Sequence, residues 1–312
     1  MSKKIKIGTR GSKLALWQAY HIQELLAAKG LESEIVIIDT KGDKILDVSI
    51  AKIGSKGVFT EELEDQLRDG RIDLAVHSAK DMQSSLPDEF EIIAFTKREK
   101  VNDTIVSDSK DIDISDSSKP LTLGTSSTRR VATLKHFYPH VKTVEVRGNL
   151  QTRIRKMRDG ACDALLLAFA GVHRMGYDDQ IVSLLSLDEF TPAVGQGSVA
   201  VEIAKSLPKE DKTLIKDACN HLETSYQLRA ERAYLRVLEG GCSIPVFALA
   251  QSEGKKLALK GGIVDLEGKE RIVKEVSGPV EEAETLGKEL AAQVLGSGGD
   301  VILKDIKTKL GK

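Results

Sequence analysis

The stretch RDGRIDLAVHSAKD, residues 68–81, gives the plainest sign of the architecture. Its RDG is a typical helix end, because glycine adopts the left-handed backbone conformation that stops a helix. The apolar residues 72–76 that follow predict a buried strand, and the polar residues 77–81 continue from it. A helix, a tight turn and a buried strand in this order are typical of an α/β fold with a largely parallel sheet.

A second copy of this pattern, RDGACD at residues 158–163, precedes the apolar run 164–168. Outward from both copies, helix-like periodicity alternates with short apolar or β-branched runs. Further strands are expected at 5–9, 34–39, 121–123 and 143–146, and the expected helices include 13–29 and one that begins at Thr60. The repeat predicts two similar α/β lobes, which bind ligands beyond the carboxyl ends of their strands, in a cleft between lobes.

The pattern changes at about residue 220. A helix is expected over 224–238, ended by the glycines at 240 and 241. Three strand-like runs separated by glycine-containing turns follow, at 246–250, 256–264 and 270–276, and two helical stretches come after them. We therefore expect a third, smaller α+β domain with a three-stranded antiparallel sheet.

Composition restricts the possible functions. A chain of 312 residues predicts two or three domains, and 41% hydrophobic with 30% charged residues is ordinary for a globular protein. The formal net charge of -1 argues against a broad nucleic-acid surface, and no apolar run is long enough to cross a membrane. The first ten residues lack the apolar core of a signal peptide, so a cytoplasmic location is expected.

The three cysteines are too far apart to form a CxxC pair, so neither a disulfide framework nor a metal site is expected. Cys162 and Cys219 lie beside or within apolar and helical runs, as core thiols do. Cys242 follows two glycines and precedes Pro245, which favours a reactive or modified thiol on a loop. A buried, inert thiol is the alternative.

Several arginines lie where expected strands pass into helices: Arg10, Arg129, Arg130, Arg147 and Arg153. Taken singly, each has an ordinary alternative role as a solvated surface residue or a helix-cap partner. Together they predict a ligand with several carboxylates or phosphates, because a guanidinium group makes two parallel hydrogen bonds to such a group.

Three further features lie near the expected cleft. Asp81 stands at the mouth of the first sheet, where a carboxylate can serve as an acid, a base or the partner of a transient cation. A turn-capping aspartate is the alternative. His77 has no neighbours that would form a triad, so a structural role is favoured. The long connection at 42–57 is either a mobile lid or a surface loop.

Six ordered blocks between residues 10 and 245 together resemble one family. They are RGSKLA at 10–15, VHSAKD at 76–81, GTSSTRR at 124–130, RGN at 147–149 with TR at 152–153, PAVGQG at 192–197, and EGGC at 239–242. In this order they look like the motifs of porphobilinogen deaminases, also called hydroxymethylbilane synthases.

The resemblance implies three domains, the first two similar to type II periplasmic binding proteins. Domain 1 would comprise residues 1–97 and 198–217, domain 2 residues 102–192, and domain 3 residues 220–312. The implied reaction joins four porphobilinogens, with loss of ammonia, into hydroxymethylbilane, in the biosynthesis of haem and other tetrapyrroles. A dipyrromethane cofactor that the enzyme assembles itself would be held by a thioether to Cys242. Such an enzyme would be a monomer that passes its product to uroporphyrinogen-III synthase.

The resemblance also implies residue roles. Asp81 would stabilise the cationic azafulvene left by loss of ammonia, protonate the leaving amine and accept the proton released from the new bond. The residues that contact the cofactor would be Ser78, Lys80, Thr125, Ser126, Arg129, Arg130 and Gln196. The residues that contact the substrate would be Arg10, Ser12, Arg147, Arg153 and Arg174.

Two departures from the family pattern concern the site. After Asp81 the family usually has a hydrophobic residue and a proline, whereas this chain has Met82 and Gln83, so we expect a looser loop around the carboxylate. Between the first two domains the family commonly has RED-x-RD, whereas residues 98–103 read REKVND. This second departure puts the contacts of the interdomain hinge in doubt.

Two other functions fit part of the pattern. A non-catalytic two-lobed protein that binds a polycarboxylate or an oxyanion would use the same arginines, but it gives no reason for a third domain that presents Gly-Gly-Cys. A phosphate-binding or nucleic-acid enzyme would also use them. The near-neutral charge and the low aromatic content of 4% argue against that second function.

Overall fold

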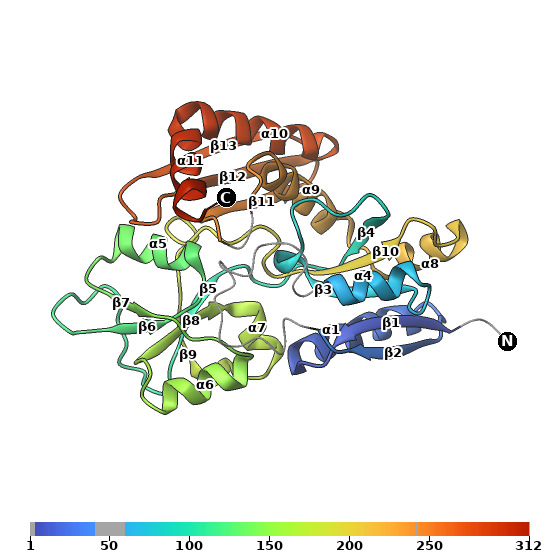
Figure 1. Ribbon diagram of the computed structural model, residues 1–312, viewed down its shortest axis with the longest axis horizontal. Coiled ribbons are helices and arrows are strands. Elements are labelled where there is room, and N and C mark those ends of the chain that lie inside the picture. The colour runs from blue at the N-terminus through green and yellow to red at the C-terminus, as the bar shows by residue number, and fades with distance from the viewer. Residues whose placement is uncertain (1–3, 41–59, 241–242, 312) are drawn as a thin grey trace.

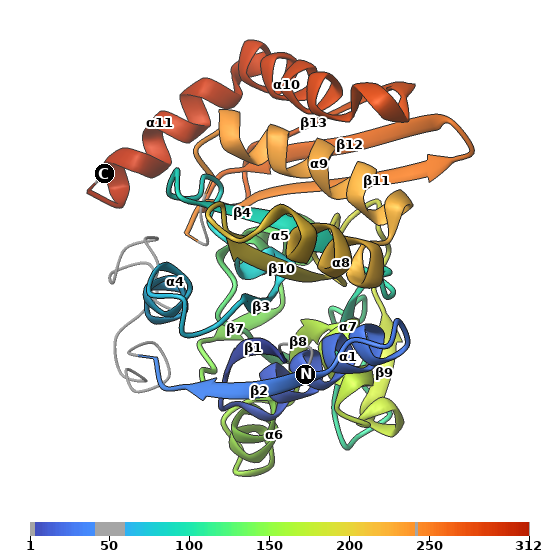
Figure 2. The ribbon, with the colours of Figure 1, turned by 90° about the vertical axis from the view of Figure 1, so that its right-hand side faces the viewer.

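The structure, a computed structural model, describes residues 4–40, 60–240 and 243–311. Figure 1 shows three bodies: two α/β lobes side by side, and a C-terminal body in which helices lie on a small sheet. Figure 2, turned by a quarter, shows the C-terminal body at one end of the molecule. The expected fold class, two α/β lobes with a smaller α+β domain, is confirmed.

The first lobe is built on a five-stranded sheet of order β2-β1-β3-β10-β4. Its strands β1, β2 and β3 are parallel, whereas β10 runs antiparallel to β3 and β4. The strands are β1 (Ile5–Arg10), β2 (Ser33–Ile38), β3 (Leu74–Ser78), β4 (Phe90–Phe95) and β10 (Val199–Ala204). The helices that pack on them are α1 (Lys13–Ala27), α4 (Glu61–Arg68) and α8 (Lys209–Cys219).

The second lobe repeats this arrangement in the order β7-β6-β8-β5-β9, with β6, β7 and β8 parallel and β5 antiparallel to β8 and β9. Its strands are β5 (Asp103–Val106), β6 (Thr122–Gly124), β7 (Lys142–Val144), β8 (Ala164–Ala168) and β9 (Ile181–Leu184). Its helices are α5 (Thr128–Phe137), α6 (Leu150–Arg158) and α7 (Phe169–Arg174). The sheets are mixed rather than largely parallel, because β5 and β10 each enter a lobe directly after the chain has crossed from the other one.

The repeated RDG motif has the same structure in both lobes. Its glycine ends α4 in one lobe and α6 in the other, with φ of +65° and +87°, a conformation that favours glycine. The aspartate that follows accepts a backbone hydrogen bond from a neighbouring parallel strand: Asp73 from Lys6 of β1 at 2.9 Å, and Asp163 from Thr122 of β6 at 2.7 Å. The motif therefore ties β3 to β1 in the first lobe and β8 to β6 in the second.

The C-terminal body has the antiparallel sheet β11-β12-β13. Its strands are β11 (Val246–Glu253), β12 (Lys256–Val264) and β13 (Arg271–Pro279), and its helices are α9 (Leu222–Val237), α10 (Ala283–Val294) and α11 (Asp300–Lys309). Helices α9 and α10 pack against each other and, with the sheet, enclose an apolar core. Of the helices in the described residues, none is long and apolar enough to cross a membrane.

Two chain segments cross between the lobes, at residues 96–102 and 185–198, and they bond to each other. The Glu99 amide donates to Gly197 O at 3.0 Å, and Arg98 Nε donates to Gln196 O at 2.9 Å. Arg98 also pairs with the fully buried Glu231 of α9, at 2.6 Å. Arg98 thus makes contacts at the hinge, although the motif at 98–103 differs from the family pattern.

Several predicted elements have different bounds in the structure, among them β3 and α9. The strand expected at 72–76 is β3, which begins at Leu74 and continues through the polar residues to Ser78. The helix expected from residue 224 begins at Leu222, because the side chain of His221 accepts a hydrogen bond from the Thr224 amide and caps the helix. The shift in β3 brings its polar end into the sheet.

Candidate functional site

The turn that carries Asp81 is fixed by the second crossing segment. β3 passes directly into a 3-10 turn at Ala79–Asp81. The Ala79 amide donates to Ser198 O at 3.0 Å. Gly195 packs so closely on this turn that an added Cβ would lie 2.8 Å from the carbonyl carbon of Ala79. Asp81 ends the turn with its side chain exposed, at the carboxyl end of a buried strand.

Arg10, Ser12 and Ser78 lie at the same edge of the first sheet. Arg10 ends β1, and Ser12 caps α1 by accepting a 3.3 Å hydrogen bond from the Ala15 amide. Ser78 Oγ accepts a 2.8 Å hydrogen bond from Nε2 of the buried Gln18. The parallel strands β1 and β3 therefore bring together residues that are far apart in the sequence.

Lys80 is influenced by charges of both lobes. Burial lowers the pKa of Lys80 to about 8, and the neighbouring Asp81 opposes this shift. From the second lobe, Arg130 and Arg129 lower the pKa further, whereas Asp103 raises it. The Lys80 ammonium is therefore placed toward the junction between the lobes.

Arg129, Arg130 and Gln196 surround the carboxylate of Asp103, and all four residues are buried. Arg129 Nη2 lies 2.8 Å from Asp103 Oδ2, Arg130 Nη2 lies 2.7 Å from Oδ1, and Gln196 Nε2 lies 3.0 Å from Oδ1. Burial by itself would raise the pKa of Asp103, but the two arginines hold it well below its usual range. Three of the predicted cofactor contacts thus form one buried network, which we call the Asp103 cluster.

Thr125 and Ser126 form the loop between β6 and α5. Thr125 Oγ1 accepts a 3.3 Å hydrogen bond from the Ser127 amide, and Ser126 Oγ donates to Val146 O at 2.9 Å. Ser127 caps α5, whose first turn carries both arginines of the Asp103 cluster. The two predicted contact residues therefore lie at a helix N-terminus beside that cluster.

Arg147 and Arg153 flank the start of α6. Arg153 Nε donates to a backbone oxygen at 2.7 Å, and Arg147 Nε lies 3.8 Å from Oε1 of Glu145. Burial lowers the pKa of Arg153, the nearby Arg130 lowers it further, and Asp81 raises it. A carboxylate of the first lobe and a guanidinium of the second therefore act on each other across the junction.

Arg174, the last residue of α7, contacts the first lobe. Its Nη2 donates to Gly197 O at 2.7 Å, and its guanidinium carbon lies 4.9 Å from the centre of the Trp17 ring in α1. Burial lowers the pKa of Arg174, and Glu99 opposes that shift. Arg174 of the second lobe therefore lies against α1 of the first lobe and against the second crossing segment.

Sequence reasoning missed two buried acidic residues near the site, Asp103 and Glu202. His77 Nε2 lies 3.0 Å from Glu202 Oε2, and both side chains are almost fully buried, so His77 belongs to a buried pair rather than a triad. Asp103 is far in sequence from Arg129 and Arg130, and Glu202 is far from His77. Of the two acids, only Asp103 had a signal in the sequence, because it is the last residue of the hinge motif at 98–103.

Cys162 and Cys219 are buried, as predicted for core thiols, and burial raises the pKa of Cys219 to about 12. Cys242 and the connection at 42–57 lie outside the described residues. Within residues 4–40, 60–240 and 243–311, no group of three or more His, Cys, Asp or Glu side chains could hold a metal ion.

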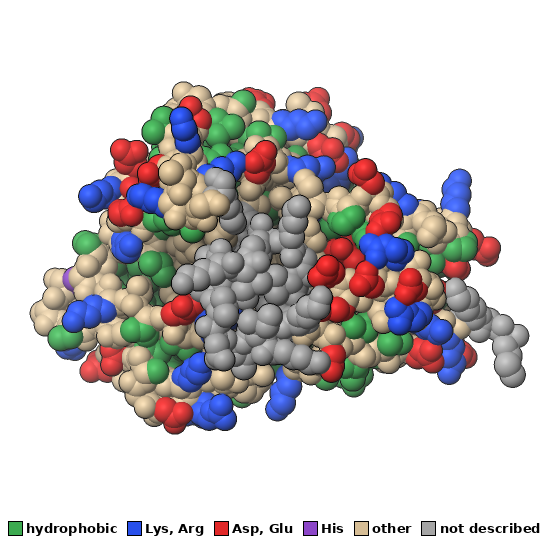
Figure 3. Space-filling model, in the orientation of Figure 1, with side chains coloured by type: hydrophobic (Ala, Val, Ile, Leu, Met, Phe, Trp, Pro, Cys, Tyr) green, Lys and Arg blue, Asp and Glu red, His purple; other side chains and the backbone are tan. Residues whose placement is uncertain are grey.

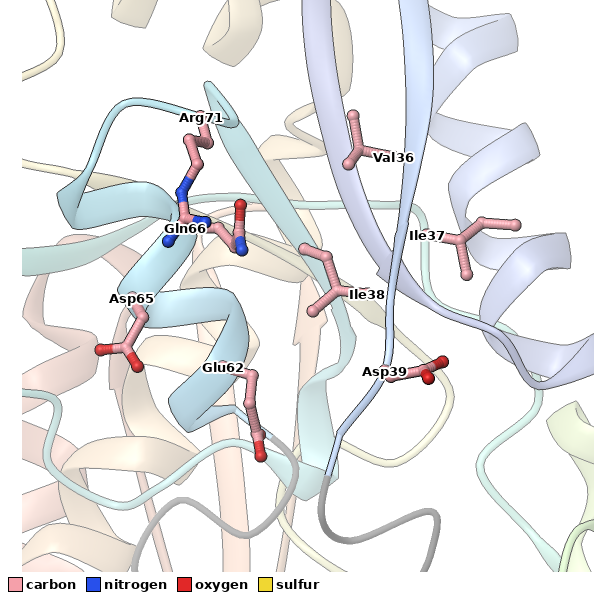
Figure 4. Close-up of a pocket in the computed structure, with 8 residues that line it drawn as sticks. All are labelled: Val36, Ile37, Ile38, Asp39, Glu62, Asp65, Gln66 and Arg71. Carbon is pink, nitrogen blue, oxygen red and sulfur yellow. The ribbon is translucent and has the colours of Figure 1, made fainter.

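A surface hollow of about 370 Å³ lies elsewhere, between β2 and α4. Figure 4 shows that Ile38, Glu62 and Gln66 are among its lining residues, and it contains none of the predicted site residues. On the face seen in Figure 3, basic and acidic side chains both occur across the described surface, and several acidic side chains gather to the right of the grey atoms. This mixture agrees with the formal net charge of -1.

Comparisons with known proteins agree with the motifs. A family model described as "Porphobilinogen deaminase, dipyromethane cofactor binding domain" matches residues 5–212, and one described as "Porphobilinogen deaminase, C-terminal domain" matches residues 225–296. The chain is 57% identical to the porphobilinogen deaminase of Cytophaga hutchinsonii, over 100% of both chains. It is 54% identical to that of Desulfosudis oleivorans, over 97% of this chain and 98% of the relative.

Among solved structures, a double-mutant VFT2 domain of Bordetella pertussis BvgS is similar to 73% of this chain and to 91% of its own length, with a TM-score of 0.43 and 18% identity. That likeness is too distant to add to the assignment. The two family models cover most of the chain, and the relatives match it from end to end. The chain belongs to the porphobilinogen deaminase family, whose members act in tetrapyrrole synthesis.

Proposed function

We propose that this chain is the transferase that removes ammonia from porphobilinogen and joins four of these units head to tail into hydroxymethylbilane. The observation that carries the proposal is the setting of Asp81. It is an exposed carboxylate on a fixed turn. Its negative charge raises the pKa of Lys80 beside it and the pKa of Arg153 in the other lobe. The basic side chains suit a substrate that carries carboxylates, and the single acid suits a reaction with a cationic intermediate.

The acid–base chemistry is assigned to Asp81. Its carboxyl group protonates the leaving amine, and the resulting carboxylate stabilises the azafulvene cation that remains on the substrate. After the new carbon–carbon bond forms, the same carboxylate accepts the proton lost from the attacked pyrrole carbon. General acid–base catalysis of this kind contributes about 10²–10⁴-fold to the rate.

The cationic residues are assigned to the acetate and propionate groups of the substrate and the growing chain. Arg10, Arg147, Arg153 and Arg174 act here with Ser12, in keeping with their positions at the edge of the first sheet, at the start of α6 and at the end of α7. Burial sharpens their effect, because a charged hydrogen bond sheltered from water is worth about 1.5–3 kcal/mol. Their number matches a ligand whose negative charge grows with each added ring.

A second set of polar and basic residues fits a dipyrromethane cofactor, whose two pyrroles also carry carboxylates. Lys80, Ser78, Thr125 and Ser126 would hold it, with the Asp103 cluster keeping Arg129, Arg130 and Gln196 in place behind them. When bound, the cofactor supplies the pyrrole carbon that primes the chain. We assign its thioether attachment to Cys242, on the sequence motif alone.

The proposal includes the cellular setting and the division of the chain. The protein acts in the cytoplasm as a monomer and passes its product to uroporphyrinogen-III synthase. Its domains are residues 1–97 with 198–217, residues 102–192, and residues 220–312. The pairing of β10 with β3 and β4 supports the first of these, because it joins a late segment to the N-terminal sheet.

The test is the turnover of porphobilinogen by the native chain, by Asp81→Asn and by Asp88→Asn. Asp88 is an exposed aspartate further along the same loop and serves as the matched control. We expect native protein and Asp88→Asn to consume porphobilinogen, and Asp81→Asn to lose about 10²–10⁴-fold in kcat. Tight binding of porphobilinogen without turnover by the native chain would instead indicate a binding protein.

A further inference from the structure

Gln83 joins the segment after Asp81 to two other elements. Its Nε2 donates hydrogen bonds of 3.1 Å to Thr60 Oγ1 and 3.2 Å to Glu64 Oε1, at the start of α4. Its backbone oxygen accepts a 2.8 Å hydrogen bond from Arg232 Nη2, on α9 of the C-terminal body. One residue thus links the turn to the first lobe and to the C-terminal body.

The partners of Gln83 are themselves fixed. Thr60, Glu64 and Arg232 are 3%, 6% and 8% exposed, so none of them can turn to bulk water instead. A buried polar group that loses its partner carries the full cost of its desolvation, which makes the paired arrangement of Gln83 strongly preferred. The three hydrogen bonds therefore define one position for the backbone at residue 83.

Met82, between Asp81 and Gln83, is fixed by apolar packing. It is 4% exposed and lies in a small core with Ala79, Phe95, Ala200 and Leu228. Both residues after the carboxylate are thus anchored, one by apolar contacts and the next by hydrogen bonds. The departure from the hydrophobic–proline pattern does not loosen the loop as the sequence suggested, because the glutamine amide supplies contacts that a proline lacks.

We propose that Gln83 is a positioning residue for Asp81, and that it sets the rate of the chemical step without touching the substrate. The inference rests on the proposed function, in which Asp81 is the catalytic carboxylate. A misplacement of a catalytic group by about 1 Å can cost roughly 10²-fold in rate. Loss of the hydrogen bonds of Gln83, two residues after Asp81, can therefore lower kcat. Substrate affinity depends on other side chains and should change little.

The test compares Gln83→Met with Gln23→Met. Gln23 is also half-buried in the first lobe, and its Nε2 donates a single 3.1 Å hydrogen bond, to Ser33 O, away from the turn. For Gln83→Met we expect kcat to fall about tenfold, with KM within about twofold of native. Gln23→Met should lose thermal stability while its kcat stays within about twofold of native. Intact mass should show the same covalent adduct on both variants.

Thr60→Val provides a second, nearly isosteric variant, which removes the hydroxyl that accepts from Gln83. It should lower kcat in the same direction, and in the double variant with Gln83→Met the two losses should not multiply, because both remove one tether. Native-like kcat in Gln83→Met, with a lowered melting temperature, would overturn the inference. Failure of the proposed function looks different, since the native chain itself would then not turn over porphobilinogen.

Discussion

Replacing Asp103 by asparagine should destabilise the protein severely. The native carboxylate is fully buried and lies 2.8 Å from Arg129 and 2.7 Å from Arg130, so asparagine leaves two buried guanidinium groups without a counter-charge. Breaking a buried ion pair from one side typically costs about 3–5 kcal/mol. We expect a loss in that range, measured as the change in the free energy of unfolding in urea at pH 7.

Asp108→Asn is the matched control. Asp108 lies 2.8 Å from Arg158, in the same lobe, but both side chains are 50% exposed. An exposed pair contributes about 0–1 kcal/mol, so this variant should unfold almost as the native protein does. If Asp103→Asn also stays within about 1 kcal/mol of native, the buried ion pairs do not hold the second lobe together as argued.

The effect of Asp103 should also depend on pH. The folded-state pKa of Asp103 lies below its unfolded value, so its contribution to stability is present above the unfolded pKa and is lost as the pH falls toward the folded one. The unfolded pKa of an aspartate is about 3.9. The stability gap between native protein and Asp103→Asn should therefore be constant near neutral pH and should narrow below about pH 4. A gap that widens with acid would refute the reasoning.

Three other variants test the site. Because the pKa of Lys80 is lowered to about 8, kcat/KM should fall as the pH rises through that value, and Lys80→Arg should remove this limb, since arginine stays charged. Arg174→Lys keeps the charge but loses the planar contact with Trp17, so kcat/KM should fall about tenfold, against no change for the exposed Arg155→Lys. Gly195→Ala places a methyl group 2.8 Å from the backbone of the Asp81 turn and should lower kcat at least about tenfold.

Each of these variants has an outcome that contradicts its argument. If kcat/KM of Lys80→Arg still falls at alkaline pH as it does in the native protein, the titrating group is not Lys80. If kcat/KM falls equally in Arg174→Lys and Arg155→Lys, the loss does not arise from the contact of Arg174 with Trp17 of α1. Gly254 has φ of +58° and open space around it, so Gly254→Ala imposes backbone strain alone. If it impairs kcat as much as Gly195→Ala does, the close packing on the turn is not the cause.

The architecture could be predicted where the sequence carries a local rule. The RDG motifs predicted two lobes because a helix stop, a turn and a buried strand follow one another directly. The strands β4, β5, β9 and β10 were missed, and for β5 and β10 the reason is physical. β5 has four residues and begins with Asp103, and β10 contains Glu202, so a buried acid interrupts the apolar pattern of each. These two acids are buried because they pair with residues of other elements, and the hydrophobic periodicity of the sequence does not reveal such pairs.

The site could be predicted in part for the same reason. Arginines at strand-to-helix junctions were expected at one edge of each sheet, and Arg10 and Arg153 lie at such positions. The ion pairs of Arg129 and Arg130 with Asp103 could not be predicted from spacing, because the three residues come from two separate elements. Nor could the tether at Gln83 be foreseen, since its partners lie on α4 and α9.

The most direct test of the proposed function is the intact mass of the purified native chain beside Cys242→Ser, with Cys219→Ser as a control for a buried thiol. We predict that the native chain and Cys219→Ser are heavier than their sequences by one dipyrromethane unit, whereas Cys242→Ser is not. If the native chain matches its bare sequence mass even after incubation with porphobilinogen, covalent priming at Cys242 is contradicted, and the proposed mechanism with it.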